Sequence, residues 1–359
     1  MRYYCTYFDH NYLPRGLALY ESLRRHSPAF ELWVLCLSRE CYDWLAQKQF
    51  PEVRLITLEE FEQSDPELLP AKQNRSIVEY YFTCTPSLPL FVFAHSPQAD
   101  LITYLDADLF FFSDPESVFA EMGARSIAII PHCFPPALKH LEATGIYNVG
   151  WVSFRRDEQG QACLSWWRQR CLEWCYDQIE PTRFGDQKYL DEWPTRFQNV
   201  AVLKHKGANL GPWNLANYEI RFEAGRVRVD EDDLVFFHCH GFQQINQWLY
   251  EPRLIGFAAR PTRVIRRHIL LPYWHALKRA QRQIQTGDQN SLAPAGLRER
   301  SKNRPEARAF FGQKLWAKIR RWHRLSMGLM KQRYVLVWPW EASPPRAEPM
   351  PLHAKTDSR

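Results

Sequence analysis

The sequence predicts an α/β protein with a mostly parallel central sheet, flanked by helices and followed by a basic, helical C-terminal extension. Three observations lead to this prediction. Apolar runs of strand length alternate with helical patterns over the first 250 residues. The composition, 45% hydrophobic and 24% charged residues in a chain of 359, excludes a disordered or collagen-like protein. The charge is also divided unevenly along the chain.

The elements follow one another in a regular order. Residues 2–9 are rich in β-favouring side chains and predict a strand, and the apolar spacing in 12–27 predicts a helix. A buried strand within 99–115 ends in two carboxylates. We expect further strands at 31–38, 53–58, 126–132, 145–157 and 234–242, and further helices at 41–50 and 161–178. Ligands of open α/β sheets bind beyond the carboxyl ends of the strands, so functional residues are expected there.

The charge distribution predicts the domain organisation. Residues 253–359 hold 23 Lys and Arg against 6 Asp and Glu, whereas residues 1–252 hold 23 against 34. An acidic body is suited to collecting a divalent cation, and a basic tail is suited to phosphate-rich partners. We therefore predict a catalytic-type domain at 1–252, a basic helical extension at 253–340 with a linker at 291–296, and a disordered tail at 341–359.

Location and cysteine chemistry are predicted by what the sequence lacks. It contains no run of 18 to 20 apolar residues and no apolar signal core near residue 1, so we expect a cytoplasmic chain. Its nine cysteines form no C-x-x-C pair. We interpret them as reduced thiols in ordinary packing.

Two short motifs predict a metal site. Asp106 and Asp108 emerge from the apolar run LITYLDADLFFF, where unpaired carboxylates would be costly without a cation. The run LVFFHCHGF ends in His238 and His240, and we expect both motifs at strand ends of one sheet. An imidazole added to two carboxylates favours Mn²⁺ over Mg²⁺. Taken alone, D-x-D is more often a solvated turn, and either histidine is more often a surface or core residue.

The order of five motifs resembles the nucleotide-diphospho-sugar transferases of the GT-A fold, most closely those like glycosyltransferase family 8. The motifs are CTYFDHNYLPRGLALYESL, DAD, IYNVGWVSF, FGDQKYLDEW and HCHG, and together they cover about residues 1 to 250. The resemblance implies a metal-dependent glycosyltransferase that moves a sugar from a nucleotide-diphosphate donor, UDP being favoured, to a saccharide or lipid-linked acceptor. It also suggests retention at the anomeric carbon and a role in polysaccharide assembly.

The resemblance assigns a role to each matching residue. Asp106, Asp108 and His238 would hold Mn²⁺ or Mg²⁺, with His240 as the less favoured ligand. Donor binding would involve Asp106 and five further residues, namely Thr6, Asp9, Asn11, Arg75 and Asn148. Asp186 and Gln187 would lie near the reacting sugar carbon. The alternative to a functional role is a structural one. Arg75 would then be an exposed arginine on a helix, and Asp186 with Gln187 would cap the start of a helix.

One departure from the family concerns the diphosphate. Family 8 commonly follows His-x-x-Gly with Lys-Pro-Trp, but this chain continues as GFQQINQW without a lysine. We expect the compensating cation to come from Arg75 or from the KHKG segment, Lys204 to Gly207.

The basic segment 307–338 combines apolar residues at helical spacing with many Lys and Arg, which predicts an amphipathic helix. It would either associate peripherally with anionic membrane or pack on the body or a second subunit. The rival function is a non-enzymatic membrane- or nucleic-acid-binding protein, but it leaves DAD, Asn148, the pair Asp186 and Gln187, and HCHG unexplained. A haloacid-dehalogenase-like phosphatase and a sugar-phosphate nucleotidyltransferase fit less well, because Phe110 breaks the first pattern and the second needs a Gly-rich loop.

Overall fold

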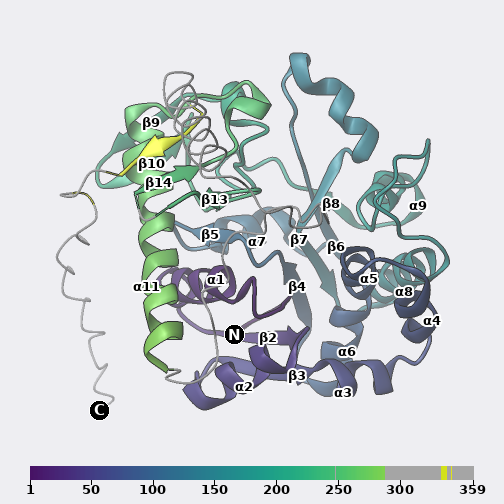
Figure 1. The fold of residues 1–359 in the computed structure, drawn as a ribbon. Helices are drawn as coiled ribbons and strands as arrows, with labels where there is room; N and C mark the ends of the chain where they lie inside the picture. The colour runs from purple at the N-terminus through teal and green to yellow at the C-terminus, as the bar shows by residue number, and fades with distance from the viewer. Residues whose placement is uncertain (247, 288–332, 338–340, 342–359) are drawn as a thin grey trace, which may run out of the picture.

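A seven-stranded sheet forms the centre of the computed structural model, which describes residues 1–246, 248–287, 333–337 and 341 (Figure 1). Its strands, in spatial order, are β3 (Val53–Thr57), β2 (Phe30–Cys36), β1 (Arg2–Phe8), β4 (Leu101–Leu105), β7 (Tyr147–Arg155), β6 (Ile127–Pro131) and β8 (Val200–Val202). Within this sheet β7 pairs antiparallel with both neighbours, and the other pairs are parallel. The predicted fold class is confirmed.

Helices cover both faces of the sheet. Successive side chains of a strand point to opposite faces, so each strand contributes residues to two core clusters. Tyr4 belongs to a core cluster with side chains of α1 (Leu13–His26), α2 (Arg39–Lys48), α7 (Glu116–Met122) and α11 (Leu271–Gly287). Cys5 belongs to the cluster on the other face, with side chains of α3 (Leu58–Ser64), α4 (Leu68–Asn74), α5 (Ile77–Cys84), α6 (Ser87–His95), α8 (Glu158–Glu173) and α9 (Trp193–Arg196). A strand covered on both faces is buried along its whole length, as β4 is, and its residues are mostly apolar.

Three small sheets lie beyond the central one. The strands β5 (Leu109–Phe111) and β12 (Phe236–His238) pair antiparallel. The second sheet contains β9 (Ile220–Glu223), β10 (Arg226–Val229) and β11 (Asp232–Asp233), and the third contains β13 (Gln243–Gln244), β14 (Leu249–Glu251) and β15 (Val335–Leu336). Short 3-10 helices occupy Pro136–Thr144, Lys188–Glu192, Leu215–Asn217 and Ile255–Phe257, and the helical run Arg263–Ile265 and Arg266–Leu270 leads into α11.

Three sequence expectations need correction. The stretch 234–242 forms a strand only at β12, and β12 pairs with β5 in a separate two-stranded sheet rather than with the central sheet. The helix expected at 161–178 begins at Glu158 and ends at Glu173, with the Asp157 carboxylate accepting the Gly160 N–H at its start. Helices α3 to α6 occupy the region between 59 and 98, for which the sequence predicted no elements.

The C-terminal predictions are tested only in part by the described residues. Side chains on both sides of the predicted boundary at 252, such as Tyr250 and Tyr273, share a third core cluster. The division into domains stays a prediction. The linker 291–296, most of 307–338 and all of 341–359 except Glu341 lie outside the described residues. The membrane contact and the cytoplasmic location also stay predictions.

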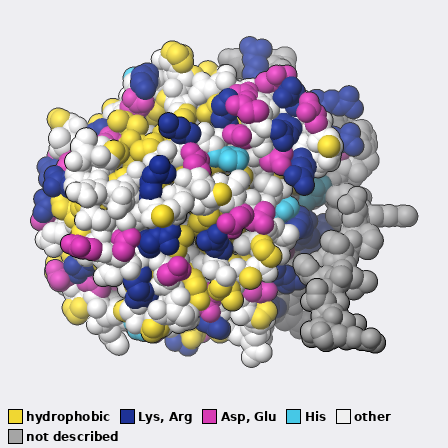
Figure 2. Space-filling model, turned by 180° about the vertical axis from the view of Figure 1, so that it is seen from behind, with side chains coloured by type: hydrophobic (Ala, Val, Ile, Leu, Met, Phe, Trp, Pro, Cys, Tyr) yellow, Lys and Arg dark blue, Asp and Glu magenta, His cyan; other side chains and the backbone are white. Residues whose placement is uncertain are grey.

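Hydropathy and charge complete the description of the body. Among the described helices, none is by itself long and apolar enough to cross a membrane, while α5 and α6 together, bent by 45°, meet the length and composition of a span. Figure 2 shows Lys and Arg interspersed with Asp and Glu over one face of the described residues. Fourteen of the 23 Lys and Arg in 253–359 lie outside those residues.

Candidate active site

Asp106 and Asp108 lie in the tight turn between β4 and β5. The Asp106 N–H donates to the Gly150 carbonyl at 3.1 Å, which ties the end of β4 to its neighbour β7. The Leu109 N–H donates back to the Asp106 carbonyl at 3.2 Å and closes the turn. Ala107, between the carboxylates, is buried. The turn therefore presents two carboxylates together at the carboxyl end of a buried strand.

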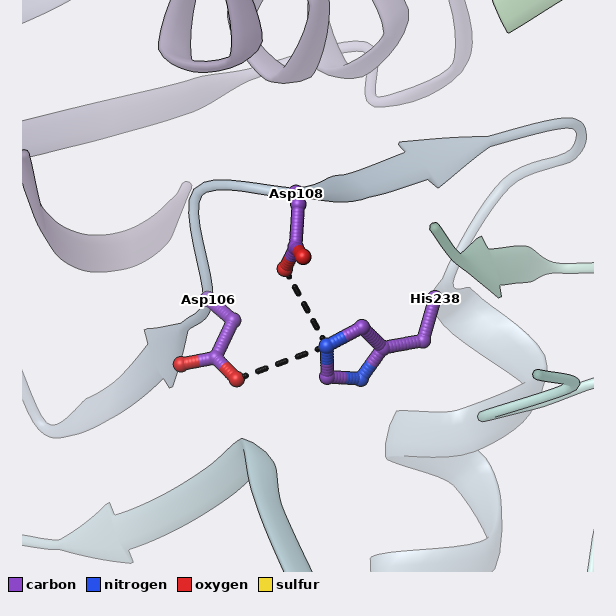
Figure 3. A group of neighbouring side chains, drawn as sticks. All are labelled: Asp106, Asp108 and His238. Atoms are coloured by element: carbon purple, nitrogen blue, oxygen red, sulfur yellow. Dashed lines mark ion pairs between the residues drawn. The ribbon is translucent and has the colours of Figure 1, made fainter. Parts of the chain in front are cut away.

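His238 reaches the same place from 130 residues further along the chain. It ends β12, where it lies opposite Leu109 of β5, and the Cys239 N–H donates to the Asp108 carbonyl at 2.9 Å. The His238 Nε2 atom is 3.1 Å from Asp108 Oδ1 and 3.5 Å from Asp106 Oδ2 (Figure 3). Pairing of β5 with β12 thus brings the second motif to the first, as the metal hypothesis required.

The three side chains fit a divalent cation. Their ligand atoms all lie within 4.8 Å of one another. Neighbouring ligands of an octahedral ion with bonds of ~2.1 Å are ~3 Å apart, close to the separation of Asp108 and His238. His240 is not part of this group within the described residues. It lies 6.1 Å from His238, ring centre to ring centre.

Burial and mutual charge set the protonation of the group. Burial raises the pKa of Asp106, and repulsion by Asp108 adds to this effect. Burial also opposes ionisation of Asp108, but the charges of His238, His240 and Arg15 hold its pKa at about 2. Burial likewise opposes charging of His238, yet the two carboxylates raise its pKa above the usual value. The site therefore attracts positive charge, which a proton on His238 or a metal ion supplies.

Asn148 and Gln187 lie beside the metal-binding group. The Asn148 Oδ1 atom is 3.2 Å from His238 Nδ1, and its Nδ2 atom is 3.4 Å from Gln187 Oε1. Gln187 donates through Nε2 to the Thr144 carbonyl at 3.0 Å. Two further residues that the resemblance names are therefore connected to His238 through hydrogen bonds.

Asp186 is buried close enough to Asp106 for their charges to interact. Burial, followed by repulsion from Asp106, raises the pKa of Asp186 to about 7, although a hydrogen bond from Thr85 opposes the shift. Its backbone carbonyl accepts the Trp167 Nε1–H at 2.8 Å, which fixes the loop on α8. Asp186 is thus a carboxyl group that titrates near neutral pH beside the candidate site.

Asp9 and Asn11 form the turn that follows β1, the strand next to β4. The Asp9 carboxylate accepts the Asn11 N–H at 3.0 Å, the Asn11 side-chain amide at 2.9 Å and the Tyr12 N–H at 3.0 Å. Thr6 is completely buried in β1, and its hydroxyl has no hydrogen-bond partner among the described residues. The turn lies at the edge of the sheet where the metal-binding group is found, whereas Thr6 lies within the core.

Arg75 is held elsewhere in the described structure. Its guanidinium donates to the carbonyls of Cys171 and Leu172, both at 2.7 Å, and to the Thr83 hydroxyl. These bonds satisfy carbonyl groups at the C-terminal end of α8, which lack partners within the helix. The donor role of Arg75 stays a prediction, and its guanidinium already serves as a helix cap.

The arginine or lysine side chain that acts on Asp108 is Arg15, and not Arg75 or a lysine of the KHKG segment. Lys206, from the KHKG segment, pairs with Asp230 at 3.0 Å and Glu231 at 2.8 Å. Arg15, in the first turn of α1, lies 4.5 Å from the Tyr12 ring centre and lowers the pKa of Asp108. Sequence reasoning missed Arg15, although it is four residues after Asn11 in the first motif.

Two further residues that shape the site were also missed. The ring of Trp213 lies edge-on to His238, 5.0 Å between ring centres, and no motif marked it. A Cβ atom on Gly150 would lie 2.6 Å from Asn148 Oδ1 and 2.7 Å from His238 Nδ1. The Asn-x-Gly motif carried a signal for this glycine, because a small residue there allows a close approach.

Comparisons with known proteins identify relatives over most of the chain. No family model matches it. It is 33% identical over 287 residues to YfnD of Bacillus subtilis (strain 168), covering 79% of this chain and 91% of that protein. It is 30% identical over 251 residues to YfnF of the same organism, covering 68% and 82%. Both relatives are described as uncharacterized.

Solved structures with a similar fold include two glycosyltransferases. The galactosyltransferase LgtC, in complex with donor and acceptor sugar analogs, matches with a TM-score of 0.42 and 15% identity, over 60% of this chain and 77% of that one. Mouse xyloside xylosyltransferase 1 matches with a TM-score of 0.41 and 15% identity, over 67% and 98%.

Proposed function

The chain belongs to the family of the Bacillus subtilis proteins YfnD and YfnF, and we propose that it is a metal-dependent glycosyltransferase. It would move a sugar from a nucleotide-diphosphate donor, with UDP favoured, to a saccharide or lipid-linked acceptor. The observation that carries this proposal is the convergence of Asp106, Asp108 and His238, from distant segments, at the carboxyl end of β4.

The chemistry of sugar transfer matches the charge of the site. When bound, Mn²⁺ or Mg²⁺ neutralises the negative charge that develops on the departing diphosphate. Asp106, Asp108 and His238 would hold the ion, and Arg15 supplies a fixed positive charge beside them. The turn of Asp9 and Asn11, at the end of the neighbouring strand, is available to the nucleoside part of the donor.

Asp186 and Gln187 are the residues that we propose for the sugar itself. A transferring sugar becomes positively charged at its reacting carbon, and an ionised carboxylate close to that carbon stabilises it. Because the pKa of Asp186 is about 7, the carboxylate form is populated at and above neutral pH. Gln187 is held by Thr144 and Asn148, so its amide is oriented before a substrate arrives. Retention of configuration is part of this proposal.

The test is a screen of nucleotide sugars for hydrolysis in the presence of Mn²⁺, measuring the free nucleotide released. We expect release from a UDP-sugar by the full chain, and its loss in Asp106→Ala and Asp108→Ala. Asp43→Ala, which removes an exposed carboxylate of α2, is the matched control and should keep the activity. Full activity of Asp106→Ala or Asp108→Ala in chelator-treated buffer would contradict the metal assignment.

A further inference from the structure

The side chain of Asn148 uses all of its polar atoms within the protein. Its Oδ1 atom accepts the Gly150 N–H at 3.0 Å and lies 3.2 Å from His238 Nδ1. Its Nδ2 atom lies 3.2 Å from His132 Nε2 and donates to Gln187 Oε1 at 3.4 Å. Asn148 and His132 are both buried. One amide therefore connects His238 to a second histidine that no motif singled out.

One backbone N–H fixes where every proton in this network lies. A backbone N–H can only donate, so the atom facing Gly150 must be the amide oxygen of Asn148. That oxygen can only accept, so His238 must carry its proton on Nδ1. The lone pair of a neutral His238 is then on Nε2, the atom that faces Asp106 and Asp108.

The same reasoning determines the state of His132. The amide nitrogen of Asn148 can only donate, so the Nε2 atom of His132 must accept. Its proton is then on Nδ1, which lies 3.2 Å from the Ile146 carbonyl and donates to it. His132 is therefore a neutral imidazole, in agreement with its burial, which lowers its pKa to about 3.

We propose that Asn148 is a positioning residue of the metal site, held in its orientation by Gly150 and His132, that presents the Nε2 lone pair of His238 to the ion. This inference rests on the metal site of the proposed function. A metal-binding histidine generally donates its second N–H to a carboxylate or a carbonyl, which fixes the ring and its tautomer. An amide oxygen does the same without adding negative charge beside Asp106 and Asp108.

The surroundings leave His238 little freedom to adopt another orientation. Trp213 packs edge-on against its ring, and the same indole packs edge-on against His132, 5.3 Å between ring centres. Gly150 lies so close to His238 that even a methyl group there would contact the imidazole. This role for Asn148 differs from the donor contact that the resemblance implies, because its amide is already fully used.

The first test measures Mn²⁺ affinity by electron paramagnetic resonance of the free ion, with no sugar donor present. Asn148→Leu removes every hydrogen bond of the amide, and we expect a 10- to 100-fold weaker Mn²⁺ affinity. Asn148→Asp keeps an oxygen for His238 and Gly150 but loses the donor to His132, so we expect it to bind Mn²⁺ more tightly than Asn148→Leu does. Ser153→Ala is the control. Ser153 lies on β7, as Asn148 does, and the variant loses a buried hydrogen bond to Thr103 of β4 but should bind Mn²⁺ normally.

The second test reads the tautomers directly by ¹⁵N NMR of the full chain with diamagnetic Mg²⁺. We expect Nδ1–H on both His238 and His132 in wild type, and loss of that preference at His238 in Asn148→Leu. Nε2–H on His132 in wild type would overturn the proposal even if the leucine variant failed to fold. Unchanged Mn²⁺ affinity in a folded Asn148→Leu, or no Mn²⁺ binding by wild type, would overturn it as well. Mn²⁺ binding without release of nucleotide from any donor would contradict the proposed function alone.

Discussion

Gly150→Ala tests how closely the metal ligand is packed. Gly150 lies in β7 with a backbone that any residue adopts, because its φ is not positive. A methyl group there would lie 2.6 Å from Asn148 Oδ1 and 2.7 Å from the Cε1 and Nδ1 atoms of His238. Alanine is therefore acceptable to the strand but not to the two side chains beside it.

The size of the effect follows from these distances. Ordinary contacts between carbon atoms begin near ~3.5 Å, so His238 or the strand must move by about 0.8 Å. Both side chains are buried and hydrogen-bonded, so neither can move into solvent. Overpacking of this kind costs about 1–3 kcal/mol of unfolding free energy. Displacing the imidazole should also weaken Mn²⁺ binding by about 10- to 100-fold.

The assay compares thermal unfolding and Mn²⁺ affinity in wild type, Gly150→Ala and a matched glycine variant. Gly256→Ala is the control, because a Cβ there meets no atom within 4 Å and the backbone is not in a left-handed conformation. We expect Gly256→Ala to bind Mn²⁺ as wild type does. If Gly150→Ala had the unfolding temperature and the Mn²⁺ affinity of wild type, the close approach described for His238 would be wrong.

Three further predictions use single variants. Arg75→Ala should lower the unfolding free energy by about 2–3 kcal/mol in a denaturant titration, because two carbonyls at the end of α8 lose a charged donor; an unchanged midpoint would contradict the capping role. The raised pKa of Asp186, about 7 against 3.8 in the unfolded chain, means that the metal-free folded state binds the proton more tightly. The contribution of Asp186 to stability should therefore fall as pH rises from 4 to 7, so in urea titrations Asp186→Asn should gain stability relative to wild type over that range. Burial, with Arg25 nearby, lowers the pKa of His26 to about 4, so the contribution of His26 to stability should fall as pH drops from 6.5 to 4, and wild type should lose stability relative to His26→Gln. A His26→Gln protein that lost as much stability as wild type over that range would refute this assignment.

Some features of the site could be predicted from the sequence because they depend on short segments. The apolar run before Asp106 predicts a buried strand, and the two carboxylates must then emerge at its end. The turn of Asp9 and Asn11 depends on neighbouring residues in the same way. The choice of His238 over His240 came from motif spacing, and the structure brings His238 to the carboxylates.

Other features depend on contacts between distant segments and could not be predicted from the sequence. His238 was expected on the same sheet as Asp106, but it arrives on β12, whose partner is β5. The donor role of Arg75 stays a prediction, and only the structure shows the hydrogen bonds of its guanidinium to the end of α8, almost a hundred residues away. Arg15 was overlooked because nothing in the local pattern shows that α1 begins beside Asp108.

The sequence by itself determined the alternation of strands and helices, the acidic turn and the identity of the three metal-binding candidates, since hydrophobic periodicity and short motifs are local properties. The tertiary structure alone decided which atoms of those residues face one another. The Asn148 amide has two possible orientations in any sequence, and the packed Gly150 N–H selects the one that places a proton on Nδ1 of His238. Such a selection requires hydrogen-bond partners from several strands and loops, and folding is the step that brings them together.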